Sequence, residues 1–146
     1  MGTTQNEKNN AMLIHLSSFG SLIIPFGSLI LPIILWQAMK KDSNYVNFHG
    51  KQAVNFNISF FIYNIIAIIL FFGSSLGAII NVIQEGDSAA NFQDISGTLF
   101  SVGGIITAII ILSAIGLIKL IFILIAAIKA SQGEEYKYPL TIPFVR

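Results

Sequence analysis

The sequence predicts an all-α, polytopic membrane protein, and two properties of the chain carry this prediction. Of its 146 residues, 54% are hydrophobic and only 10% are charged, whereas a soluble domain carries about 25% charged residues. The apolar residues also form runs long enough to cross a hydrocarbon core, which takes about 20 helical residues. We therefore expect one helical domain inside a lipid bilayer.

Composition and motifs argue against several functions. The formal net charge of +1 disfavours a nucleic-acid partner, which requires a clustered basic face. The chain has no cysteine, so disulfides, thiolate metal ligands and cysteine nucleophiles are excluded. It contains no HExxH or GxSxG motif, and its two histidines lie on separate segments with no acid inside an apolar run. We expect no enzymatic activity, no metal site and no cofactor.

The first apolar region, residues 11–39, is interrupted at Pro25 and Pro32. Proline removes a helical hydrogen bond and restricts the residue before it. The sequence therefore predicts two short helices, 11–24 and 28–39, each about 20 Å long at about 1.5 Å per residue. Since a hydrocarbon core is about 30 Å thick, the two pieces form either a short hairpin or one kinked span, and the hairpin is favoured.

Two long transmembrane helices are predicted over residues 50–83 and 97–130. The first begins with polar side chains that recur every three or four residues and so line one stripe of a helix. These residues are Gln52, Asn55, Ser59 and Tyr63. Amides and hydroxyls at this depth either bond neighbouring helices or line a polar path, and both interpretations stay open.

Lys119 is the one charged residue within an apolar run. An ammonium near mid-bilayer costs roughly 3 kcal/mol on insertion scales. Lys119 is therefore either a residue of an ion or proton path, or a lysine that snorkels or pairs with a polar stripe. His15 is likewise either a functional group inside the bundle or a packed histidine near the start of the first helix, and the packed interpretation is favoured.

Loop charges predict the orientation. The Lys40–Lys51 loop is basic, the 84–96 loop is acidic without a cation, and the C-terminal flank is basic. By the positive-inside rule, the Lys40–Lys51 loop and the C-terminus face the cytoplasm, in a cell (plasma) membrane. The expected organisation is a polar N-terminal tail at 1–10, a single helical transmembrane domain at 11–133 and a cytoplasmic tail at 134–146.

Two separated segments carry a resemblance to a known family. They contain His49, Gly50, Lys51, Gln52, Ala53, Asn55 and Phe56, followed near the C-terminus by Tyr138 and Pro139. Together they resemble a bacterial family of small membrane proteins of unknown function that is similar to the Tic-twenty component of the chloroplast protein-import machinery. The resemblance covers residues 10–144. It implies a translocation- or transport-related membrane component.

Two function classes follow. In a translocation component, the polar stripe and Lys119 would line a path, and because three or four helices rarely enclose a pore alone, a homo-oligomer or other membrane proteins would complete it. The alternative is a non-conducting accessory, regulatory or immunity-type membrane protein that acts through protein partners. The two differ in whether the polar stripe faces a water-filled space or a protein segment.

Overall fold

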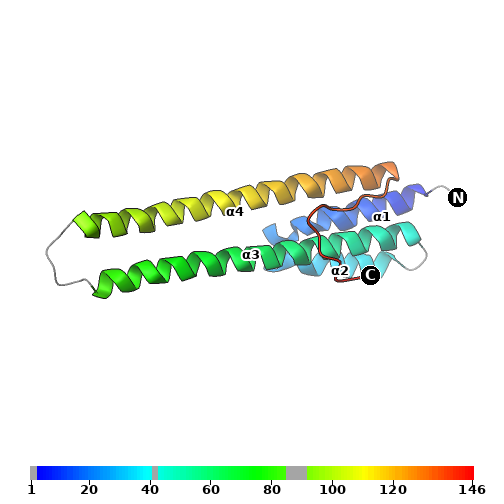
Figure 1. Cartoon of the computed structure of the whole chain (residues 1–146). Helices are drawn as coiled ribbons and strands as arrows, with labels where there is room; N and C mark the ends of the chain where they lie inside the picture. The colour runs from blue at the N-terminus through cyan, green and yellow to red at the C-terminus, as the bar shows by residue number, and fades with distance from the viewer. Residues whose placement is uncertain (1–2, 41–42, 85–91) are drawn as a thin grey trace. The chain divides into compact units, whose positions relative to one another are not determined.

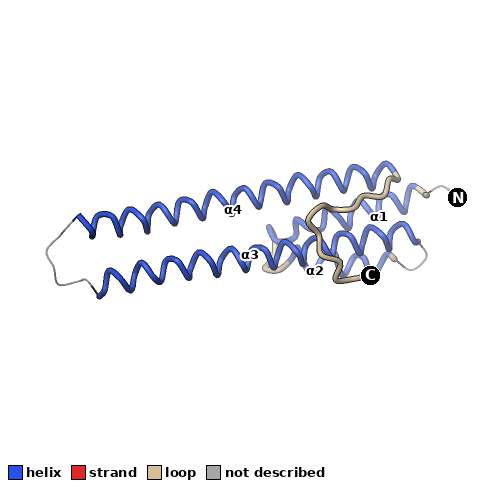
Figure 2. The backbone as a smooth tube through the Cα atoms, viewed as in Figure 1, coloured by secondary structure: helices blue, strands red, loops and turns tan. Residues whose placement is uncertain are grey.

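The computed structural model is helical, as predicted, and describes residues 3–40, 43–84 and 92–146 (Figures 1 and 2). Side chains are described for these residues except 70, 73–75, 77–84, 92–102 and 105. The elements in order are α1 (Gln5–Leu16), the 3-10 helix η1 (Ser17–Leu22), α2 (Gly27–Met39), α3 (Asn44–Gln84) and α4 (Phe92–Gln132). The described part of the chain contains no strand, and two short helices precede two long ones, which confirms the predicted fold class.

Among the residues that the structure describes, two segments are long and apolar enough to cross a membrane. They are Asn44–Ile69 in α3 and Ile106–Gln132 in α4, with mean hydropathies of 1.5 and 2.9. Most of the second segment exposes its aliphatic side chains and very little of it is buried. Since a core helix of a soluble protein would bury such residues, the exposed side chains of α4 fit a lipid surrounding.

The described helices belong to two compact units. The first unit comprises Met1–Phe61 together with Ile118–Arg146, and the second comprises Ile62–Leu117. The described part of the second unit is the continuation of α3 and the beginning of α4, and most of the large apolar side chains described there are exposed. The first unit holds the buried core, the hairpin and the C-terminal tail.

The proline-broken N-terminal region is a hairpin rather than one kinked span. η1 and α2 pack so closely that a Cβ on Gly27 would lie 2.1 Å from the carbonyl oxygen of Gly20. Phe26, just before α2, adopts a left-handed conformation with φ of 59°, which reverses the chain direction. The chain therefore returns towards the end from which α1 started (Figure 1).

All four α-helices begin earlier than the sequence predicted, α2 by a single residue. α3 starts at Asn44, so residues 44–51 are helical and the prediction of a loop there was wrong. The Ser43 hydroxyl accepts a hydrogen bond from the Val46 N–H at 3.2 Å, which is an N-cap. α1 starts inside the segment predicted as a polar tail, because Thr4 and Glu7 form a capping box. α4 starts at Phe92, so residues 92–96 of the predicted 84–96 loop are helical, and residues 85–91 of it lie outside the described residues.

Trp36 fastens the hairpin to α3. Its indole packs against Gly50 so tightly that a Cβ there would lie 1.9 Å from Trp36 Cδ1. Its Nε1–H donates to Asn47 Oδ1 at 3.0 Å, and the Lys40 ammonium lies 4.9 Å from the ring centroid. Trp36 also belongs to the buried apolar cluster of the first unit, with Ile14, Val46, Ala53 and Val54.

This close approach predicts that Gly50→Ala destabilises the protein although alanine is the better helix former. The added methyl group must displace Trp36, and overpacking of this kind typically costs about 1–3 kcal/mol. Gly116→Ala is the matched control, because a Cβ at Gly116 meets nothing within 4 Å, and helix propensity should make it neutral or stabilising. Thermal unfolding in detergent measures both variants. Equal melting temperatures for the two would contradict the predicted contact.

Candidate functional site

Three ring side chains from three segments form one hydrogen-bonded chain in the first unit. The Tyr138 hydroxyl lies 2.9 Å from His15 Nδ1, and His15 Nε2 lies 2.8 Å from His49 Nδ1. Tyr138 comes from the C-terminal tail, His15 from the last turn of α1 and His49 from the second turn of α3. All three side chains are buried. The contact therefore joins the hairpin, a long helix and the tail at one point.

One assignment of donors and acceptors satisfies both hydrogen bonds between Tyr138, His15 and His49. A buried tyrosine hydroxyl has a single proton, and the acceptor in reach is His15 Nδ1. His15 then carries its own proton on Nε2 and donates it to His49 Nδ1. His49 in turn carries its proton on Nε2, which is buried without a hydrogen-bond partner among the described residues. Both imidazoles are neutral in this arrangement.

Aromatic rings enclose the three polar groups. The Tyr138 ring stacks on Phe56 at a centroid distance of 3.9 Å and an angle of 13°. The Tyr45 ring meets His49 edge-on at 4.5 Å. Because apolar ring faces cover the hydrogen bonds, water does not compete for them, and each bond fixes the geometry of its partners.

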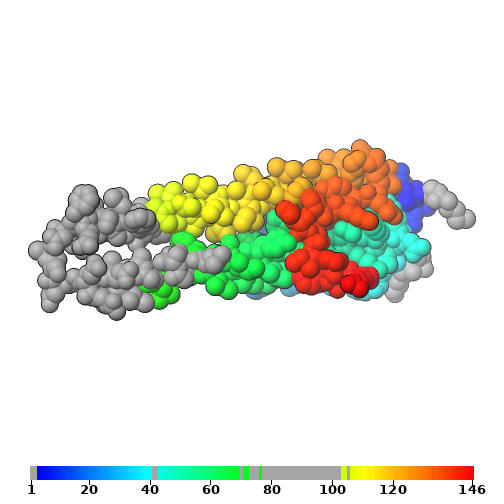
Figure 3. Space-filling view, in the orientation of Figure 1, coloured from blue at the N-terminus to red at the C-terminus, as the bar shows by residue number. Residues whose placement is uncertain are grey.

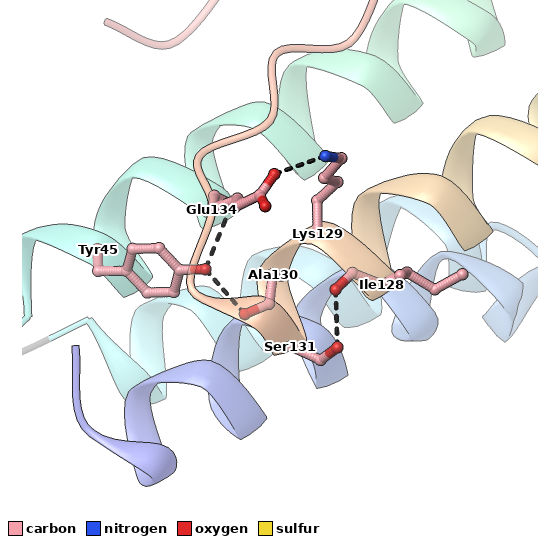
Figure 4. Close-up of polar contacts among 6 residues, drawn as sticks. All are labelled: Tyr45, Ile128, Lys129, Ala130, Ser131 and Glu134. Carbon is pink, nitrogen blue, oxygen red and sulfur yellow. Dashed lines mark hydrogen bonds and ion pairs between the residues drawn. The ribbon is translucent and has the colours of Figure 1, made fainter. Parts of the chain in front are cut away.

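The C-terminal end of α4 is hydrogen-bonded to Tyr45 of α3 (Figure 4). The Tyr45 hydroxyl donates to the carbonyl of Ala130 at 2.8 Å, with the carbonyl of Glu134 at 3.4 Å. Gly133, with φ of 89°, ends the helix, and the Glu134 N–H bonds back to the Lys129 carbonyl at 3.0 Å, which is a Schellman cap. The Lys129–Glu134 ion pair is solvent-exposed and adds little. The cap directs the tail back over α3.

Two polar residues of α3 hold the tail along its length. The Asn55 amide pairs with the main chain of Val145 in both directions, donating to its carbonyl at 2.9 Å and accepting from its N–H at 2.8 Å. The Ser59 hydroxyl accepts from the N–H of Ile142 at 2.9 Å and donates to the Asn55 carbonyl. Figure 3 shows the tail lying on the surface of the first unit. These side chains therefore replace water as partners of an extended segment.

A second pair of polar side chains joins the hairpin to α3. The Asn57 amide donates to the Ser18 hydroxyl at 2.7 Å and to the carbonyl of Ala53 at 2.9 Å. Asn57 and Ser18 are both buried. The Asn57 Oδ1 atom is buried without a partner among the described residues. The hairpin is thus hydrogen-bonded to α3 through three side chains, those of His15, Ser18 and Trp36.

Burial makes the site neutral. Desolvation, followed by repulsion from His49, lowers the pKa of His15 to about 3. Desolvation and then the neighbouring Tyr136 raise the pKa of Tyr138 well above its usual value. At neutral pH, His15 is therefore an uncharged imidazole and Tyr138 is protonated. The arrangement can align polar bonds and position the tail.

The four residues of the predicted polar stripe and Lys119, the other candidate for a polar path, do not share one role. Asn55 and Ser59 are buried against the tail, whereas Gln52 is half-buried in the same unit. Tyr63 belongs to the second unit. Lys119 is half-buried in the first unit, and it has no ion pair with any residue whose side chain is described. The structure therefore gives the stripe two tail-binding members rather than a continuous lining.

Sequence reasoning found some of this site and missed the rest. His49, Phe56 and Tyr138 were singled out as family-motif residues, yet nothing in their spacing indicated that they meet His15. The role of Tyr45 was missed altogether, because Tyr45 lies inside the segment predicted as the Lys40–Lys51 loop. Among the described residues, no three histidine, aspartate, glutamate or cysteine side chains lie close enough together to hold a metal ion.

The fold and this site define a helical membrane protein whose polar groups fasten its own hairpin and tail. Residues 6–145 match the model of the MamF_MmsF family, the magnetosome magnetite crystal formation protein family. Since the match covers nearly the whole chain, the protein belongs to this family. No curated protein and no solved structure matches the chain.

The family match corrects two predictions. The resemblance to the Tic-twenty type of import component was wrong, and with it the assignment as a translocation component. The motif residues explain why that resemblance misled. His49, Gly50, Asn55 and Tyr138 are packed or bonded inside the first unit, so they describe how this helical fold holds together rather than what it conducts.

The hydrogen-bond chain predicts that Tyr138→Phe destabilises the protein and loosens its tail. The phenyl ring keeps the stack on Phe56, but His15 Nδ1 loses its donor, and a buried unsatisfied polar atom costs about 1–3 kcal/mol. Tyr136→Phe is the control, because Tyr136 is only half-buried and has no part in the chain. Thermal unfolding and limited proteolysis of the tail measure the effect. Indistinguishable variants would contradict the assigned role of the hydroxyl.

The lowered pKa of His15 predicts that stability falls in mild acid. Between pH 6.5 and about 3, the unfolded chain takes up a proton at His15 that the folded chain refuses, so acid favours unfolding. The contribution of neutral His15 to the free energy of unfolding is complete above pH 6.5 and declines by about 1.4 kcal/mol per pH unit below it. Equilibrium unfolding in detergent at several pH values tests this. His15→Gln should have a shallower pH dependence, and an equal slope would refute the prediction.

Proposed function

We propose that this protein supports magnetite crystal formation as a non-conducting, membrane-embedded accessory component that acts through protein partners. The family match supports the process, and the two long apolar helices support the location in a membrane. The proposal assigns no catalytic step and no cofactor to the chain. It replaces the channel-like function that the sequence resemblance had implied.

The observation that carries the non-conducting assignment is the occupation of the polar stripe by the tail. A conducting path needs amides and hydroxyls that face water, as pore linings do. Asn55 and Ser59 instead use both their donors and acceptors on backbone groups of Ile142 and Val145 or within α3. The polar atoms of Asn55 and Ser59 are therefore hydrogen-bonded to protein rather than to water.

The basic residues of the first unit and the apolar surface of α4 bear on the orientation and the partners of the protein. We infer that the C-terminal tail, Lys40 and the start of α3 face the cytoplasm, since the cations Lys40, Lys129, Lys137 and Arg146 belong to the unit that contains them. The exposed aliphatic side chains of α4 contact lipid or the apolar helices of other membrane proteins, including a further copy of the chain. No nucleic-acid partner is proposed.

Electrical recording in planar bilayers tests the non-conducting assignment. Purified protein, shown to be folded by circular dichroism, should give no conductance steps at any voltage or in any lipid composition. Asn55→Leu and Lys119→Leu should be equally silent, because neither residue lines a path. Reproducible conductance in the parent that either substitution alters would overturn the assignment.

Crystal growth in a magnetite-forming bacterium tests the process. A strain in which this protein is the sole family member should form crystals whose size, measured by electron microscopy, changes when Asn55→Leu releases the tail. Gln52→Leu, in the same helix and the same unit, is the matched control and should leave crystal size unchanged. Normal crystals in a strain without the protein would contradict the proposal.

A further inference from the structure

The tip of the hairpin carries large apolar side chains that the rest of the first unit leaves uncovered. Leu22 and Ile23 are 84% and 82% exposed, the highest values among the described large apolar residues, and Phe26 is 60% exposed. Exposed apolar clusters of this kind mark contact with a membrane or an apolar partner.

The length of α2 places this tip near mid-bilayer. Trp36, with the Lys40 ammonium over its ring, has the residue pair typical of a membrane–water boundary. From Trp36 back to Gly27, the helix rises about 14 Å at about 1.5 Å per residue. Half of a hydrocarbon core is about 15 Å. The hairpin therefore reaches the middle of the membrane and turns there.

Contacts between the hairpin and α3 indicate the same depth of the hairpin tip in the bilayer. Trp36 packs against Gly50, and the Phe26 ring lies 5.9 Å from the ring of Phe61. Along α3, Gly50 and Phe61 are about 17 Å apart. Both residues belong to the candidate membrane span Asn44–Ile69, which continues beyond Phe61. The hairpin tip thus ends beside the interior of a span.

The backbone of the turn suits a surrounding without water. The N–H groups of Ile23 and Ile24 both bond to the Gly20 carbonyl, at 3.1 and 3.0 Å, and the Gly27 N–H bonds to the Ile24 carbonyl at 3.0 Å. Pro25 has no N–H. An irregular backbone is tolerated at membrane depth only when its polar groups are satisfied within the protein, and this turn meets that requirement for these donors.

Two polar side chains of the hairpin are buried, and its exposed side chains near the tip are mostly apolar, which also suits a surrounding without water. His15 and Ser18 are buried and bond to α3, whereas the exposed positions near the tip are apolar apart from Ser21. A single hydroxyl is commonly found in membrane helices. His15 lies beside Ile14, which shares a cluster with Trp36, so the histidine is at the depth of the boundary rather than of the tip.

We propose that residues 17–36 form a wedge that inserts into one leaflet of the bilayer, with its acyl chains as the partner of the exposed tip. The inference rests on the membrane location in the proposed function. Because the chain turns back at Pro25, the hairpin adds two helical cross-sections to one leaflet and none to the other. It expands the leaflet on the side of both chain termini and favours a membrane that is convex on that side.

Single-cysteine labelling tests the insertion, since the chain has no native cysteine. Asn6→Cys, Gln37→Cys and Glu135→Cys occupy exposed positions at the polar end of the first unit and should react with a membrane-impermeant maleimide from the same side. Leu22→Cys and Ile23→Cys should resist the impermeant reagent from both sides. A fluorophore attached there in detergent should be quenched most by lipids with a nitroxide deep in the acyl chain.

Two labelling results would overturn the wedge. The first is a tip cysteine that reacts from water on either side, and the second is Asn6→Cys reacting on the side opposite to Glu135→Cys, as a kinked span requires. Both readouts are independent of conductance. The wedge can therefore fail while the non-conducting assignment stands, and the reverse is also true.

The same variants test the leaflet expansion. Glu135→Cys protein is reconstituted into small sonicated vesicles and into large extruded vesicles of the same lipid, and the fraction labelled from outside is measured. The wedge predicts a larger outward fraction in the small vesicles, whose outer leaflet is strongly convex. An orientation that does not depend on vesicle size would refute the expansion of one leaflet.

Discussion

The hydrogen bond between His15 and His49 is the contact on which the first unit depends. It joins the hairpin to α3, and the remaining nitrogen of His15 binds the tail through Tyr138. A single neutral hydrogen bond contributes only about 1 kcal/mol, but an orphaned buried partner costs more. Loss of any one member therefore leaves the others unsatisfied in the interior. This interdependence makes three distant segments fold as one unit.

Close backbone approach makes that contact possible. Gly20 and Gly27 let η1 and α2 touch, and Gly50 accepts the face of Trp36. In a membrane the hydrophobic effect does not hold helices together, because lipid tails are as apolar as leucine side chains. Helix association therefore relies on close packing of small residues and on polar hydrogen bonds. The first unit has both. The described part of the second unit has mainly exposed aliphatic side chains, which is the composition expected of a surface in contact with lipid.

The C-terminal tail is the hydrogen-bond partner of two polar residues of α3, Asn55 and Ser59. An asparagine and a serine one turn apart could equally bind water in a path or bind a peptide backbone, and the same residue types serve both. In this protein they bind Val145 and Ile142. The tail is thereby held on the surface of the first unit by side-chain-to-backbone hydrogen bonds.

Sequence alone determined the class of fold, because runs of apolar residues with few charges have no stable alternative to membrane helices. Pro25 likewise marks a break between η1 and α2, whereas Pro32 lies inside α2 without ending it. Local signals at Thr4, Glu7 and Ser43 could have given the true starts of α1 and α3, but amphipathic residues before a span resemble a loop. The site itself was decided by tertiary structure. His15, His49 and Tyr138 are 34 and 89 residues apart along the chain, and only packing of the hairpin and tail against α3 shows that their polar atoms meet.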